Sequence, residues 1–191
     1  GDVYKRQALG IRNPGGDYIQ LATTLLQIEN EFYGTIRPKR VIFQGERPLH
    51  ALRERGVEYI EVRLMDLNPF EAIGIDAATL RFLDVFLLHC LLAESPPDSP
   101  DEIRELAYNQ HLTAARGREP GLQLQRNGQP VALVDWGLEI IDQLGPIAAR
   151  LDALDGGGDH AQAVAQARAS LLAPDTLPSA RVLSAIRHDH G

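Results

Sequence analysis

Cysteine is nearly absent from this chain, and its scarcity limits the chemistry that the chain can perform. Cys90 is the one cysteine among 191 residues, so no disulfide can form within the chain. No spacing of cysteine and histidine supplies four zinc ligands. Together with the lack of a secretory signal at the N-terminus, this predicts a cytoplasmic protein in a reducing compartment.

Long apolar runs and an excess of positive charge are also missing. No stretch reaches the ~18 consecutive apolar residues that mark a membrane-spanning helix. Lys and Arg number 19 against 26 Asp and Glu, which gives a formal net charge of -7. Such a chain repels the phosphates of a nucleic acid at long range. We therefore expect neither a membrane nor a nucleic acid as a partner.

Nucleotide-binding loops of the familiar kinds are lacking as well. Neither Gly15-Gly16 nor the triple glycine 156–158 stands between a strand and a helix, the setting that a phosphate-binding glycine loop needs. No Ser-His-Asp arrangement is found either. Any nucleotide bound here must be held by another kind of site.

What remains is the composition of an ordinary folded domain, with 44% apolar and 24% charged residues. Residues 1–7 show no clear period, and we interpret them as an artefactual or foreign tail ahead of a structured part over 8–191. Alternating and helical periods predict an α+β fold whose N-terminal half is mostly strand and whose C-terminal half is helical. We expect strands over 26–33, 36–43 and 57–64, a hairpin over 122–133 around Asn127-Gly128, and helices over 77–93, 101–116, 135–152, 160–172 and 179–187.

Two of these helices carry further signals. Asp76 and Asp135 are the expected N-caps of the helices that follow them, and Pro146 is expected to kink the second of these. The helix over 77–93 is apolar nearly all round, which predicts burial on most of its sides.

The strand over 57–64 carries the candidate site. Its alternation predicts that Ile60, Val62 and Leu64 form a core face, while Glu61 and Arg63 project together from the other face, ~7 Å apart. A carboxylate is a hard oxygen ligand for Mg²⁺, and an arginine binds phosphate oxygens in pairs. These two residue types at this spacing suit phosphoryl transfer.

A simpler interpretation of the same charges also exists. An alternating triplet such as Glu-Val-Arg is common on half-exposed strands, where solvated salt bridges between neighbouring strands are the default. The same default applies to the charges that precede it. These are Glu29, Glu31, Arg37, Lys39 and Arg40.

Several longer stretches decide between the two interpretations. In order and spacing, the stretches LQIENEFY at 26–33, IRPKR at 36–40, and YIEVR at 59–63 followed by DLNPF at 66–70 closely resemble the bacterial glutamate-cysteine ligase family. The resemblance continues through 117–122 and more faintly to 179–183. It therefore covers nearly everything after residue 8.

The resemblance implies an ATP-dependent enzyme that joins the side-chain carboxylate of glutamate to the amine of cysteine through an acyl phosphate. The product would be γ-glutamylcysteine, in the first step of glutathione synthesis. By resemblance Glu61 is a Mg²⁺ ligand, Arg63 contacts the transferring phosphoryl group, and Tyr33 binds the cysteine substrate. The implied fold is a funnel-shaped antiparallel sheet with helices packed around it, as in ligases of the glutamine-synthetase-like superfamily.

The chain departs from the family in extent. The family's N-terminal portion, with further metal-binding glutamates, has no counterpart here, so we expect the C-terminal part of one catalytic domain and little activity from the chain alone. Two alternatives stay open. One is a carboxylate-amine ligase that uses another amine, and the other is a non-catalytic module in which Arg37 to Arg40 bind an anion.

Overall fold

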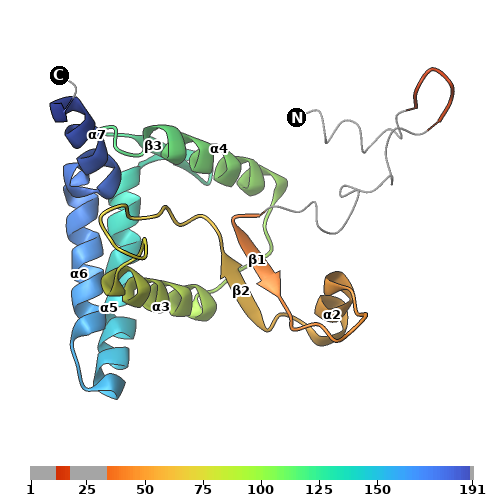
Figure 1. The fold of residues 1–191 in the computed structure, drawn as a ribbon, viewed down its shortest axis with the longest axis horizontal. Helices are drawn as coiled ribbons and strands as arrows, with labels where there is room; N and C mark the ends of the chain where they lie inside the picture. The colour runs from red at the N-terminus through yellow and green to blue at the C-terminus, as the bar shows by residue number, and fades with distance from the viewer. Residues whose placement is uncertain (1–11, 18–33, 190–191) are drawn as a thin grey trace. The chain divides into compact units, whose positions relative to one another are not determined.

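The computed structural model describes residues 12–17 and 34–189, which fall into two compact units divided between Asp66 and Leu67 (Figure 1). Short antiparallel sheets and a larger share of helix place the chain in the α+β class. The predicted strand over 26–33, with Tyr33, lies outside the described residues. Within the described part, no helix is both long and apolar enough to cross a bilayer.

The first unit is built around two antiparallel strands, β1 (Ile36–Lys39) and β2 (Tyr59–Val62), which lie side by side in Figure 1. The register sets Arg37 opposite Glu61 and Lys39 opposite Tyr59. Both strands are shorter than predicted. The chain leaves the ladder after Lys39, because the next residues make contacts with a helix and with side chains instead of with β2.

The predicted core face of β2 is wrong for the described part of the chain. Ile60 is 43% exposed and Leu64 is 52% exposed, although the alternation placed both in a core. The physical reason is that two strands alone cannot cover a face of their own sheet. An apolar strand face becomes a core only where another layer packs on it.

The helix α2 (Pro48–Arg55), which the sequence patterns did not indicate, follows β1. It has Pro48 at its first position but buries only Ala51, so it presents no apolar stripe for a periodic pattern to reveal. Arg55 at its end fastens the helix. Its guanidinium donates to both carboxylate oxygens of Glu46 at 2.7 and 2.8 Å and lies over the Phe43 ring, 4.3 Å from its centre.

The Glu46 contact gives α2 a dependence on pH. The hydrogen bonds from Arg55 and from the Phe43 amide lower the pKa of the Glu46 carboxyl from 4.5 to about 2. A carboxyl with a lowered pKa stabilises the fold above its unfolded pKa and loses that contribution as the pH falls through its folded pKa. We therefore expect the α2 contact to weaken between pH 4.5 and about 2.

An NMR titration of the Glu46 carboxyl carbon measures this directly. The expected midpoint is about 2, and Arg55→Met should raise it towards 4.5. Arg53→Met removes an equal charge from the exposed side of α2 and should leave the Glu46 midpoint where it is. A midpoint that does not respond to Arg55→Met would show that another group holds the Glu46 charge.

The second unit is mainly helical. Its core lies where three helices meet, with α5 and α6 side by side and α3 packed on both (Figure 1). The elements in chain order are α3 (Ala77–Leu92), α4 (Pro100–Arg116), β3 (Gln123–Arg126), β4 (Gln129–Ala132), α5 (Leu133–Asp155), α6 (Asp159–Leu172), a short 3₁₀ helix (Pro174–Thr176) and α7 (Pro178–Asp189). The buried core residues are Val85, Ile141, Leu144, Ala148 and Val164.

The predicted cap of α3 and the predicted hairpin turn are confirmed. The Asp76 carboxylate accepts from the Thr79 amide at 2.6 Å and caps α3, and this hydrogen bond lowers the pKa of Asp76. Between β3 and β4, Asn127 and Gly128 have φ angles of 54° and 74°, the left-handed conformations that a tight hairpin turn requires. These features were predictable because each depends on neighbouring residues alone.

Two helices differ from their predictions. The helix predicted from Asp135 to 152 begins at Leu133, so Asp135 lies in its first turn and is not its cap, and Pro146 is accommodated in its interior. The helix α3 is less buried than its composition indicated. Leu91 is 77% exposed, because α5 and α6 cover the side of α3 that carries the core residue Val85.

The junction of α5 and α6 is held by a buried carboxylate. Asp152 accepts hydrogen bonds from the amides of His160 and Ala161, each at 2.9 Å, and from His160 Nδ1 at 2.9 Å. Burial alone would raise the pKa of Asp152, but the bonds from Ala161 and His160 outweigh burial and lower it. The carboxylate serves as a cap for α6, whose own N-cap, Gly158, has no side chain to do so.

Residues 66–70 and 179–183, two of the stretches that carry the family resemblance, are in contact in this unit although they are far apart in the sequence. The guanidinium carbon of Arg181, on α7, lies 3.6 Å from the centre of the Phe70 ring. A cation over an aromatic face at this distance is attractive. The contact ties α7 to the segment that opens the unit.

Candidate functional site

Glu61 is the centre of the candidate site on β2. Arg63 Nε donates to Glu61 Oε1 at 2.8 Å, and Lys39 Nζ, on the neighbouring strand, lies 3.2 Å from Glu61 Oε2. Glu61 and Arg63 therefore lie on the same side of the strand, as the alternation predicts. Each oxygen of the carboxylate faces its own cation.

The electrostatics keep this carboxylate ionised. The hydrogen bond from Arg63, followed by the ammonium of Lys39, lowers the pKa of Glu61. Arg37 stands directly opposite Glu61 in the register, and directly opposed residues of antiparallel strands share a face. Among the described residues, three positive side chains thus share this face with Glu61, and this excess of positive charge suits an anionic ligand.

The surroundings of Glu61 Oε2 fit a cation ligand. The Oε2 atom is enclosed, and the ammonium of Lys39 lies 3.2 Å from it. No group of three Asp, Glu, His or Cys residues in that part of the chain could hold a metal by itself. Proteins nevertheless often bind Mg²⁺ through a single carboxylate, because nucleotide phosphates and water supply the other ligands of the ion.

The structure also contains the salt bridge between neighbouring strands that the simpler interpretation predicts. Lys39 and Glu61 form an ion pair across the two strands, and both side chains are 35% exposed. Ion pairs this exposed contribute little to stability, because water screens them. A ligand can therefore displace such a pair at small cost, and the pair does not argue against a functional role.

Arg40 belongs to a different contact. Its Nη1 donates to the Arg55 carbonyl at 2.8 Å, and its Nε lies 3.5 Å from Glu58 Oε2. The bond to the Arg55 carbonyl holds the Arg40 side chain at the end of α2. The run from Arg37 to Arg40 is therefore divided, with Arg37 and Lys39 on the Glu61 face and Arg40 at α2.

Sequence reasoning named Glu61 and Arg63 but left Lys39 without a role. Its proximity to Glu61 follows from strand register, and a one-residue change of register would have put Lys39 on the opposite face. The alternation of the strand predicted over 36–43 groups Lys39 with Arg37, which was the one available signal. The roles predicted for Glu61 and Arg63 stay predictions at this point, and Tyr33 lies outside the described residues.

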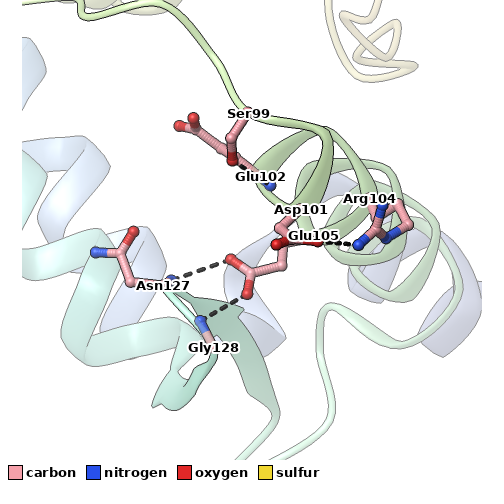
Figure 2. A pocket seen from close by; sticks show the side chains of 7 residues that line it. All are labelled: Ser99, Asp101, Glu102, Arg104, Glu105, Asn127 and Gly128. Atoms are coloured by element: carbon pink, nitrogen blue, oxygen red, sulfur yellow. Dashed lines mark hydrogen bonds and ion pairs between the residues drawn. The ribbon is translucent and has the colours of Figure 1, made fainter.

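A hollow of 470 Å³ in the second unit carries more acidic groups (Figure 2). Figure 2 shows the Glu105 carboxylate turned towards the backbone nitrogens of Asn127 and Gly128, which donate to it at 3.0 and 2.6 Å. On the same helix, the Asn109 amide bonds the backbone of Gln125. These hydrogen bonds hold the β3–β4 hairpin against α4. We therefore interpret the polar groups of the hollow as structural and not as a ligand-binding site.

A strand face with a carboxylate among cations has the residue types that bind metal ions and phosphate oxygens. Comparison with known proteins gives the particular family. The family model described as glutamate-cysteine ligase matches residues 2–113, which is more than half of the chain. The chain belongs to the glutamate-cysteine ligase family.

Individual relatives agree with the family assignment. The chain is 52% identical over 181 residues to a glutamate-cysteine ligase of Janthinobacterium sp. (strain Marseille), covering 95% of this chain and 34% of that protein. A Pseudomonas entomophila ligase is 49% identical over 175 residues, covering 91% of this chain and 33% of that protein. The chain thus spans about a third of the length of the curated relatives it matches.

A solved structure supports the fold. The crystal structure of a glutamate-cysteine ligase from Francisella tularensis, in complex with AMP, matches with a TM-score of 0.79 and 36% sequence identity. The match covers 100% of this chain and 37% of that protein's chain. The similarity therefore extends over the described elements of both units.

Proposed function

We propose that this chain is the C-terminal part of the catalytic domain of an ATP-dependent ligase that joins glutamate to cysteine and gives γ-glutamylcysteine, the first step of glutathione synthesis. The observation that carries the proposal is the Glu61 carboxylate held between Arg63 and Lys39. It lies inside the segment that matches the family model. The substrates are glutamate, cysteine and ATP.

Each proposed role follows from the geometry of the side chain. Glu61 offers an ionised, enclosed oxygen to Mg²⁺, which when bound neutralises the charge of the ATP phosphates. The bond from Arg63 Nε fixes the plane of its guanidinium, whose two Nη atoms are the usual partners of phosphate oxygens. Arg63 would steady the phosphoryl group as it passes to the glutamate carboxylate to form the acyl phosphate. Tyr33 is proposed to bind cysteine, on the family resemblance alone.

The exposed strand face supports a larger sheet in the intact enzyme. Ile36 and Ile60 are 44% and 43% exposed, and among residues 12–17 and 34–189 no third strand pairs with either edge of this sheet. We propose that β1 and β2 belong to the funnel-shaped antiparallel sheet of the glutamine-synthetase-like ligases. Residues 8–191 would supply part of that sheet and its helical support. The single cysteine agrees with a cytoplasmic location.

A chimera tests the proposed function. This chain would replace the matched segment of the Janthinobacterium enzyme, and phosphate release would be measured with ATP, glutamate and cysteine present together and with each left out. We expect release that needs all three from the chimera and none from the isolated chain. A folded chimera without this activity, beside an active Janthinobacterium enzyme, would refute the proposal. Product formed faster with another amine than with cysteine would instead favour a different carboxylate-amine ligase.

A further inference from the structure

Lys39 occupies the position on Glu61 that a metal ion would need. Its Nζ lies 3.2 Å from the enclosed Oε2 atom, while Oε1 is held by Arg63 at 2.8 Å. A divalent cation bound to Oε2 would come into close contact with the ammonium, and two like charges at that distance repel strongly. The ammonium and the metal therefore cannot hold the same oxygen together.

The residue type at this position favours exchange over permanent pairing. Of the 19 basic residues, 17 are arginines, and Lys39 is one of two lysines. A lysine carries a compact point charge on a flexible stem with four carbons, whereas an arginine is a rigid fork that stays with a paired partner. The 35% exposure of the Lys39 side chain leaves room for the stem to move. A phosphate oxygen of a bound nucleotide would give its ammonium a new negative partner.

We propose that Lys39 is an exchangeable counter-cation: it holds Glu61 Oε2 when the site is empty, and it transfers to a phosphate oxygen when a divalent cation arrives with its nucleotide. The inference rests on the proposed function, because it takes Glu61 as a metal ligand. Its consequence is an order of binding. Free divalent cations are kept away from Glu61, and the metal enters together with the nucleotide that gives Lys39 its second partner.

The test uses the full 191-residue chain with Mn²⁺ as the probe, first as MnCl₂ alone and then with ATP. Paramagnetic broadening of the backbone amide signals of β1 and β2 reports binding, without any need for turnover. Lys39→Met should tighten the binding of Mn²⁺ alone on the order of fivefold, since a repelling charge next to Oε2 is gone. The same change should weaken the binding of ATP with Mn²⁺ by a similar factor, because a phosphate contact is lost.

The opposite signs separate this role from a structural one. A lysine that only supports the strand pair would weaken both kinds of binding when removed. Arg53→Met, an equal loss of charge on the exposed side of α2, should change neither. Mn²⁺ binding that is absent, unchanged or weaker in a folded Lys39→Met chain would overturn the proposal. An inactive chimera beside the expected Mn²⁺ result would refute the ligase function alone and leave the cation exchange standing.

Discussion

Replacing Glu61 with glutamine in the chimera should lower the rate of phosphate release on the order of 10²-fold or more. The amide keeps the size of the side chain and can still accept from Arg63, but it removes the negative charge that a divalent cation needs. Arg63→Lys should produce a loss of similar order, because it keeps the positive charge and abolishes the planar pair of Nη donors. Initial rates at saturating glutamate and cysteine, over a range of Mg²⁺ concentrations, measure both losses.

A matched control separates a local effect from a general one. Glu54→Gln removes the same charge from an exposed position on α2 and should leave the rate unchanged. If Glu61→Gln and Arg63→Lys also left turnover intact in a chimera that folds normally, these residues would have no part in the chemistry. The non-catalytic anion-binding alternative would then be the better account of the strand face.

Leu144→Ala should cost the second unit about 3–5 kcal/mol of unfolding free energy. The Leu144 side chain is fully buried in the cluster where α3, α5 and α6 meet. Removing its outer carbons loses their transfer free energy and leaves a cavity that three packed helices cannot easily close. Urea unfolding followed by the fluorescence of Trp136, the one tryptophan of the chain and a residue of α5, measures the loss.

Leu154→Ala provides the comparison on the same helix. Leu154 is 66% exposed, so the same chemical change removes little buried surface and should alter the unfolding free energy only slightly. Equal losses for the two variants would mean that the helix as such, and not the cluster around Leu144, sets the stability of this unit.

Predictions from the sequence succeeded where the signal is local. The Asn127-Gly128 turn needs two left-handed residues in a row, and those residue types adopt that conformation at little cost. The Asp76 cap acts on an amide three residues away. Such features are properties of a few adjacent residues, so they do not depend on the rest of the fold.

Prediction failed where burial or a distant partner decides. The helix α2 owes its place to Arg55, which contacts Glu46 and Phe43 nine or more residues earlier in the chain. The core assigned to Ile60 needs a covering layer that two strands do not supply. Neither a salt bridge between separated residues nor the cover of a strand face leaves a periodic trace in the sequence.

The candidate site divides in the same way. The alternation of a strand placed Glu61 and Arg63 on one side, because successive side chains of any extended segment point in opposite directions. The pairing of β1 with β2 decided that Lys39 meets Glu61 and that Arg37 stands opposite it. The register of β1 against β2 depends on the energy of pairing two segments about 20 residues apart in the sequence. For this reason only the tertiary structure showed that Lys39 is the cation beside Glu61 Oε2.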